Sequence, residues 1–172
     1  SGFSAMTQTL IQHGRDGAET LAQMINHVFE PIISAIYAHG GFVILFAGDG
    51  LTVVFPRDDA DTAVSACHAA QTIAQIFIDQ PIQSTRLGDF MLTIRQGLSV
   101  GEVEWGIIES ETRKTYFFRG EAITGCAHAG HQAAGGDIVL DDQLLALLPP
   151  TAITCQPVAG AYARLTRFNP AV

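Results

Sequence analysis

The sequence predicts an α+β domain with a mainly antiparallel sheet and helices packed on it. Two short apolar runs, residues 42–46 and 51–55, flank a glycine-rich tetrapeptide, which is typical of a β-hairpin. Two longer stretches, residues 18–38 and 60–78, repeat apolar side chains every three or four positions, as amphipathic helices do. Further short apolar segments alternate with a third helical pattern toward the carboxyl end. The 172 residues suit a single domain with a sizeable core.

The amino-terminal part predicts two helices. A short helix follows SGFS and runs to Ile11, where the sequence HGRDG breaks it. The long amphipathic helix over residues 18–38 ends at Gly40-Gly41. Pro31 lies inside this pattern and removes one backbone donor, so we expect it to kink the helix or divide it.

The hairpin carries a single carboxylate, Asp49, at its tip. Val, Ile and Phe dominate both strands, and Gly48 and Gly50 allow the positive φ angles of a tight turn. This composition predicts a buried hairpin. Asp-Gly is also favoured turn chemistry, so a purely structural role for Asp49 is the alternative to a ligand-binding role.

The rest of the chain predicts helices and strands in alternation. Acidic residues at 58–61 supply the N-cap of the helix over residues 60–78, and a loop containing Pro81 and Gly88 follows it. The later elements are a bulged strand (90–100), two strands (103–109 and 114–118), a helix (120–134), a strand (138–140), a helix capped by Asp141-Asp142, and two strands (153–156 and 163–168). A strand preceding Ser1 would complete a β-α-β-β-α-β, ferredoxin-like arrangement. The chain does not begin with Met and opens inside a motif, so we expect residues 1–172 to be a fragment whose first strand is partly missing.

Composition narrows the classes of function. Seventeen acidic and nine basic residues give a formal charge of −8, which repels a nucleic-acid backbone. A phosphorylated ligand would need a metal ion to offset that repulsion. Three well-separated cysteines, Cys67, Cys126 and Cys155, indicate free thiols in a reducing compartment, so we expect a cytoplasmic location. No apolar run approaches the roughly 20 residues that span a bilayer, which predicts no membrane contact within this segment.

Several stretches together resemble the class III nucleotidyl cyclases, the family of adenylyl and guanylyl cyclase catalytic domains. The amino-terminal SGFS, GAETLAQMINHVFEPI and GGFVILFAGDGLTVVFP are similar to that family's metal-aspartate loop, long helix and hairpin. LTIRQGLSVGEVEWGII resembles its central strand, and GEAITGCAHAGHQAAGGDIVLDDQLLALL its last major helix, strand and helix. The likeness covers nearly the whole chain in the right order and is strongest to the metal-bearing half of soluble adenylyl cyclase-like proteins.

The resemblance implies conversion of a nucleoside triphosphate, ATP ahead of GTP, to a cyclic nucleotide and pyrophosphate. It implies Mg²⁺ or Mn²⁺ in a two-metal site that two aspartates hold. Asp49 is one of these aspartates, and the other would lie two positions before Ser1. It also implies that Gly2, Phe3 and Ser4 form the loop whose backbone amides hold the triphosphate. The residues that would recognise the purine base are absent, so the sequence does not decide between ATP and GTP.

At four positions where the family has residues that recognise the substrate or stabilise the transition state, this chain has other residues. Leu45 stands where the family has its base-selecting lysine, and Phe117 where it has the partner carboxylate. Thr124 and His128 occupy the positions of the transition-state asparagine and arginine. This pattern predicts the metal-bearing half of a two-half cyclase, which needs a complementary partner half and is inactive as an isolated homodimer. The alternative is a catalytically inactive cyclase-homology domain that serves dimerisation or nucleotide sensing.

Overall fold

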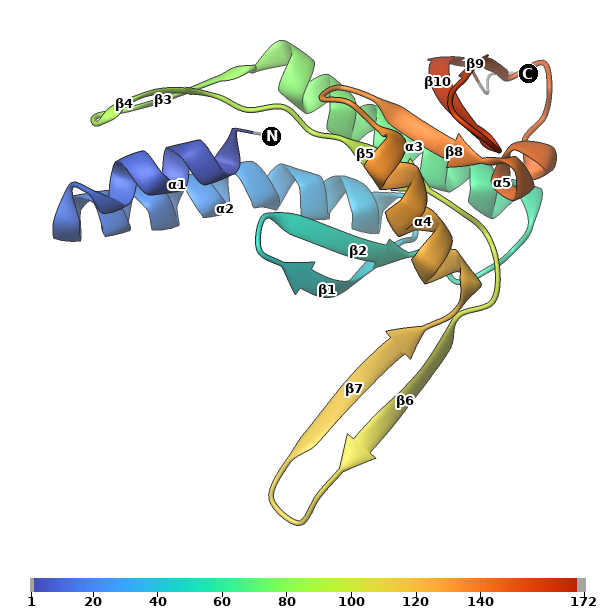
Figure 1. Cartoon of the computed structure of the whole chain (residues 1–172), viewed down its shortest axis with the longest axis horizontal. Coiled ribbons are helices and arrows are strands. Elements are labelled where there is room, and N and C mark those ends of the chain that lie inside the picture. Colours follow the sequence, from blue (N-terminus) through green and yellow to red (C-terminus); the bar gives the residue numbers. More distant parts are fainter. Residues whose placement is uncertain (1, 170–172) are drawn as a thin grey trace. The chain divides into compact units, whose positions relative to one another are not determined.

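The computed structural model describes residues 2–169, which form two compact units (Figure 1). The first unit holds the chain up to Phe55, with Ser65–Arg95 and Ala134–Gly136. The second unit holds Pro56–Val64, Gln96–Ala133 and the chain from Asp137 onward. Most strand pairs of the two units are antiparallel, so the predicted α+β class with a mainly antiparallel sheet is confirmed.

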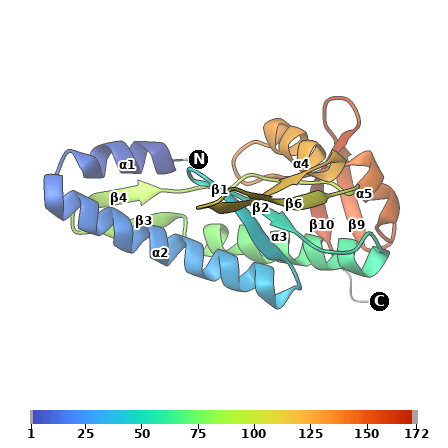
Figure 2. The same ribbon diagram turned by 90° about the horizontal axis from the view of Figure 1, so that it is seen from below.

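The first unit is built on two helices that lie side by side (Figures 1 and 2). Its elements are α1 (Phe3–Ile11), α2 (Gly14–Ala38), β1 (Phe42–Ala47), β2 (Gly50–Val54), most of α3 (Ala60–Asp79), β3 (Ile82–Thr85) and β4 (Gly88–Met91). Helix α2 passes through Pro31 without interruption, so of the two outcomes expected there, a kink or a division, the division is wrong. Apolar packing on both sides of Pro31, at Val28 and Ile32, holds the helix together although Pro31 lacks an N–H.

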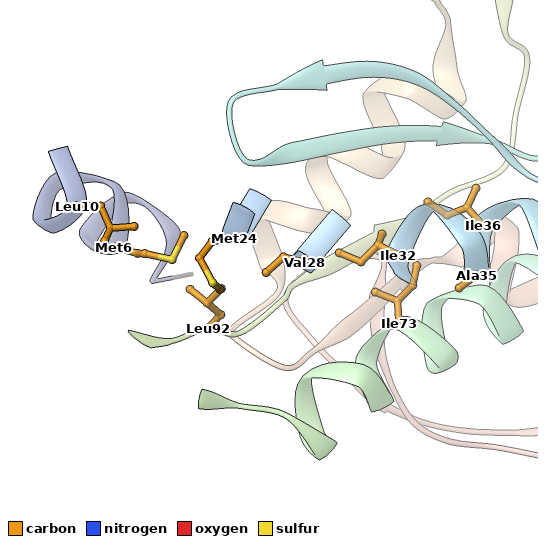
Figure 3. Packing of buried hydrophobic residues seen from close by; sticks show 9 residues of the cluster. All are labelled: Met6, Leu10, Met24, Val28, Ile32, Ala35, Ile36, Ile73 and Leu92. Carbon is orange, nitrogen blue, oxygen red and sulfur yellow. The ribbon is translucent and has the colours of Figure 1, made fainter. Parts of the chain in front are cut away.

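The core of the first unit follows the helical periodicity of α2. Figure 3 shows α2 side chains meeting Met6 and Leu10 of α1, which are fully buried. The remaining buried members are Met24, Val28, Ile32, Ala35, Ile36, Ile73 and Leu92. Four of the α2 residues recur at every fourth position, so a single face of α2 contributes most of this core.

The β1–β2 hairpin forms where it was predicted, with a two-residue turn at Gly48 and Asp49. Gly48 has φ +62°, which glycine adopts without steric cost. The expectation of a buried hairpin is wrong, because Ile44 is buried whereas every residue from Leu45 to Gly50 is exposed. Apolar composition predicts that a strand can be buried, but the neighbouring elements determine how much of it they cover.

A second hairpin, β3–β4, pairs Ile82–Thr85 with Gly88–Met91. The sequence prediction of a loop around Pro81 and Gly88 missed it, and the single strand expected over residues 90–100 is divided between β4 and β5. The turn is closed by the Thr85 hydroxyl, which donates to the Gly88 carbonyl oxygen (2.9 Å) and accepts from the Leu87 N–H (3.0 Å).

The second unit contains a four-stranded sheet in the order β5–β8–β10–β9. Its elements are β5 (Gln96–Leu98), β6 (Glu104–Glu109), β7 (Lys114–Arg119), α4 (Glu121–Gln132), β8 (Ile138–Asp141), α5 (Asp142–Leu147), β9 (Ile153–Pro157) and β10 (Tyr162–Phe168). Strands β5 and β8 are parallel, and β6 and β7 form a separate two-stranded ribbon that extends away from α4 (Figure 1).

Aspartates cap two helices, as the sequence predicts. The Asp59 carboxylate accepts a hydrogen bond from the Thr62 N–H (2.7 Å) ahead of α3. A hydrogen bond from the Thr62 side chain, and secondly this backbone hydrogen bond, lower the pKa of Asp59, and the Arg57 guanidinium lowers it further. The Asp141 carboxylate likewise accepts from the Leu144 N–H (2.8 Å) and begins α5.

Two histidine rings stack in the first unit. The rings of His39, after α2, and His68, in α3, lie 5.7 Å apart with 6° between their planes. Burial, and secondly the His39 imidazole, lower the pKa of His68 below 6.5. The unfolded chain therefore takes up a proton at His68 before the folded chain does.

We expect acidification to destabilise the protein through His68. Neutral His68 favours the folded chain. Its contribution to the free energy of unfolding is complete above about pH 6.5 and is lost as the pH falls through the lowered pKa of His68. His68→Phe keeps an aromatic ring against His39 but removes the titration, so its free energy of unfolding should decline less between about pH 7.5 and pH 5.5. Urea unfolding at both pH values tests this, with the exposed His13→Gln as a control that keeps the wild-type decline. An equal decline in all three proteins would contradict the assignment.

Candidate functional site

Asp49 lies at the exposed tip of the β1–β2 hairpin, directly after Gly48. Among residues 2–169, no hydrogen bond or ion pair engages its carboxylate. The turn therefore presents an unpaired carboxylate to solvent, and nothing in the surrounding structure uses that charge for stability.

A hollow of about 280 Å³ lies beside this turn in the first unit. Its lining joins the amino end of α1, one face of α2 and the hairpin: Phe3, Ile25, Asn26, Phe29, Ile33, Phe46 and Gly48. The Phe29 ring packs edge-to-face against Phe3 (6.2 Å between centroids) and against Phe46 (5.9 Å). Phe3 and Gly48, one residue from each of two segments that the sequence assigned to one site, thus line the same hollow, whereas Gly2, Ser4 and Asp49 are not in its lining.

The amino end of α1 offers backbone donors. Gly2 precedes the helix with φ +92°, and a side chain there would overlap the carbonyl oxygen of Met91. No side chain caps this helix end, and Ser4 in its first turn is exposed. Free N–H groups and the helix dipole favour an anion at such an end.

The donor chemistry of Asp49 fits one ligand position of Mg²⁺ or Mn²⁺, which prefer carboxylate oxygens. One carboxylate does not make a metal centre. Within the described part of the chain, no group of three or more His, Cys, Asp or Glu side chains could hold a metal ion. The second aspartate implied by the family resemblance would precede Ser1 and so lies outside the described residues.

None of the four changed positions carries a lysine, arginine or carboxylate side chain. Leu45 is 56% exposed on β1 of the first unit. In the second unit, the Phe117 ring lies against Gly106, where a side chain would collide with it. Thr124 and His128 are exposed one turn apart on α4, and the Thr124 hydroxyl donates to the Gly120 carbonyl oxygen (3.3 Å).

Sequence reasoning missed the contribution of α2 to the hollow. Asn26 is its one polar side chain, and Phe29 joins the other two aromatic rings. Phe29 matches the apolar periodicity of α2, which predicts a core residue. The periodicity gives no sign that Phe29 lines the hollow next to the turn that holds Asp49.

Solved structures share this fold. The guanylate cyclase domain of RhGC from Catenaria anguillulae, solved with GTP, matches 94% of this chain and 91% of its own, with a TM-score of 0.74 and 17% identity. The adenylyl cyclase CyaB from P. aeruginosa matches 99% of this chain and 91% of its own, with a TM-score of 0.70 and 18% identity. The fold is therefore that of a class III nucleotidyl cyclase catalytic domain, as the resemblance implied.

Sequence comparison finds similarity to adenylate cyclases. Adenylate cyclase type 10 of Oryctolagus cuniculus is 25% identical over 175 residues, covering 98% of this chain, and that of Rattus norvegicus is 24% identical over 147 residues, covering 81%. This chain is thus similar in sequence to adenylate cyclase type 10, and it spans only 10% and 9% of the lengths of these two relatives. No family model matches the chain. Among residues 2–169, no helix has both the length and the apolar character needed to cross a bilayer.

Proposed function

We propose that this chain is the metal-bearing half of a nucleotidyl cyclase, which converts ATP to cyclic AMP and pyrophosphate when paired with a complementary half. GTP is the alternative substrate. The observation that carries the proposal is the shared hollow, which is bordered by Phe3 of α1 and by the turn that holds Asp49. We further propose that residues 1–172 act as one catalytic-type domain of a longer, cytoplasmic protein.

The reaction requires a group of hydrogen-bond donors that binds the phosphates, here the amino end of α1, and a bound divalent ion. The ribose 3′-oxygen bonds to the α-phosphorus and loses its proton, while the bond from that phosphorus to the β-phosphate oxygen breaks and pyrophosphate leaves. Backbone N–H groups of residues 2–4 would donate to the phosphate oxygens and so orient the triphosphate. Asp49 would be a ligand of a Mg²⁺ or Mn²⁺ ion, which when bound neutralises charge on those oxygens.

The partner half would supply what this chain lacks. Leu45 and Phe117 offer apolar surface in place of polar base-reading groups, and Thr124 and His128 replace the transition-state pair that the family resemblance implies. A chain with a formal charge of −8 also has no cationic excess to offset a triphosphate. Lysine, asparagine and arginine positions on the partner would provide base recognition and charge stabilisation.

We expect this domain alone, produced with the residues that precede Ser1 but without any second cyclase half, to form no cyclic AMP with Mn²⁺ and ATP. A second copy carrying Leu45→Lys, Phe117→Asp, Thr124→Asn and His128→Arg supplies the missing groups, and adding Asp49→Asn silences its own metal position. Each protein by itself should be inactive, and their mixture should form cyclic AMP, as measured by liquid chromatography.

The controls of this mixing experiment separate the two functions. Circular dichroism first verifies that the multiple variant folds. Activity of the unmodified protein by itself would show that the four positions are misassigned. If the mixed proteins are folded but form no cyclic AMP, and calorimetry detects no Mn²⁺-dependent ATP binding, the result would favour the alternative of a catalytically inactive cyclase-homology domain.

A further inference from the structure

A second and larger cavity of the first unit lies on a different side of α2. It has a volume of about 610 Å³ and is lined by α2, the carboxyl end of α3 and β3, and we name it the α2–α3 pocket. The hollow described above takes Ile25, Phe29 and Ile33 from α2, whereas the α2–α3 pocket takes Glu30 and Ser34. With 3.6 residues per turn, these two sets face different directions. The polar lining residues of the α2–α3 pocket are His27, Glu30, Ser34, Asp79, Gln80 and Gln83.

The charge of the α2–α3 pocket is negative. Glu30 and Asp79 contribute carboxylates, and the lining contains no lysine or arginine. Among residues 2–169, no hydrogen bond or ion pair engages the Glu30 carboxylate. The Asp79 carboxylate accepts a hydrogen bond from the Gln75 amide (2.7 Å), which leaves its charge uncompensated. The pocket therefore attracts a cation and repels an anion.

Gln83 gives the α2–α3 pocket a buried hydrogen-bond acceptor. The residue is only 8% exposed, and its Nε2 donates to the Gln80 carbonyl oxygen (2.8 Å). Within the described part of the chain, nothing donates a hydrogen bond to the Gln83 Oε1. Buried polar groups in proteins are nearly always hydrogen-bonded, so this amide oxygen indicates a donor that comes from outside the chain.

Pro31 leaves a further acceptor in the same lining. In an α-helix, each carbonyl oxygen accepts from the N–H four residues later, but Pro31 has no N–H to donate to the His27 carbonyl oxygen. Both residues line the α2–α3 pocket. A primary ammonium group has three N–H donors and no acceptor, so it complements a lining in which carboxylate, amide and carbonyl oxygens predominate.

The remaining wall of the α2–α3 pocket favours an organic cation over a metal ion. It is apolar and comes from Val28, Pro31, Ile76 and Phe77, which suits a carbon skeleton or an aromatic ring. A metal ion needs a set of ligands, and no group of three or more His, Cys, Asp or Glu side chains in residues 2–169 could hold one. The volume of the pocket lies in the range of cavities that bind small organic molecules.

We propose that the α2–α3 pocket binds a small organic amine in its protonated form. Glu30 supplies the opposite charge, the Gln83 Oε1 accepts a hydrogen bond, and the apolar body of the amine packs against Ile76 and Phe77. Glu30 is exposed, so salt weakens the attraction between its carboxylate and the ammonium group. This inference does not depend on cyclase activity.

A matched pair of probes tests the requirement for positive charge. Tryptamine carries an ammonium group on an aromatic body, and tryptophol has the same body with a hydroxyl group instead. Calorimetric titration should show one saturable site for tryptamine, at least about tenfold weaker binding of tryptophol, and weaker tryptamine binding when NaCl rises from about 0.05 to about 0.5 M. The absence of saturable tryptamine binding, or equal binding of the two probes, would overturn the proposal.

Two glutamates of α2 provide matched variants. Glu30→Gln, in the α2–α3 pocket, should weaken tryptamine binding at least about tenfold. Glu19→Gln removes the same charge from an exposed position outside the lining and should leave binding unchanged. Ser34→Phe fills the pocket without altering its charge and should abolish binding, with circular dichroism as the check on folding. Equal effects of the two glutamine variants would mean that tryptamine only senses the overall negative charge, and the proposed site would fail.

Discussion

Gly97→Ala is expected to lower the free energy of unfolding by about 3 kcal/mol. The added carbon would overlap the backbone of α4 at Cys126 and Gly130, and it would lie 2.7 Å from the Gly130 Cα. Backbone atoms cannot rotate away as a side chain can, so α4 must move off β5. Thermal unfolding should show a midpoint roughly 6–12 °C lower.

The partner glycine provides the control for this prediction. A methyl group at Gly130 would lie 3.8 Å from the Gly97 nitrogen, an ordinary contact distance. Alanine favours a helix over glycine by about 0.5–1 kcal/mol, so Gly130→Ala should be neutral or slightly stabilising. Equal destabilisation by both variants would mean that α4 and β5 do not pack through Gly97.

Asp49→Asn is expected to reduce cyclic AMP formation about a hundredfold to a thousandfold in the mixture with the complementing copy. The substitution keeps the size of the side chain and the turn chemistry but removes the charge that would hold a divalent ion. Because no hydrogen bond or ion pair engages Asp49 among the described residues, thermal stability should not change. The assay is initial-rate cyclic AMP formation with saturating ATP and Mn²⁺.

A second exposed aspartate distinguishes a specific effect from a general loss of negative charge. Asp58 is exposed and lies outside the hairpin, so Asp58→Asn should retain wild-type activity in the same mixture. If Asp49→Asn retains activity as well, Asp49 is only a turn residue, and the proposed role in metal binding fails.

Local signals in the sequence predicted most elements of the fold. Helix α2 repeats apolar residues at every fourth position, and the β1–β2 hairpin combines β-branched runs with Gly48. The β3–β4 hairpin was missed because Gln83, Ser84 and Thr85 are polar and lack apolar alternation. Those strands are instead fixed by their turn and by cross-strand pairing, which a periodicity argument does not detect.

The site was predicted less completely than the fold. Asp49 occupies the predicted hairpin tip, since turn chemistry is local. The hollow beside it depends on tertiary packing that brings Phe3 and Phe29 together from different helices. The side chains that line this hollow therefore could not be deduced from sequence spacing, and neither could the exposure of Leu45 and Phe46.

The parallel pairing of β5 with β8 has a consequence for how the chain folds. Strands β1 and β2 meet across a two-residue turn, and β6 and β7 are also neighbours in sequence, so both pairs can form on the microsecond timescale typical of hairpins. Residues 96–98 must instead find residues 138–140 after the whole intervening segment has collapsed. Closing that long loop costs chain entropy before the two strands can pair, so we expect completion of the four-stranded sheet to be slower than formation of either hairpin.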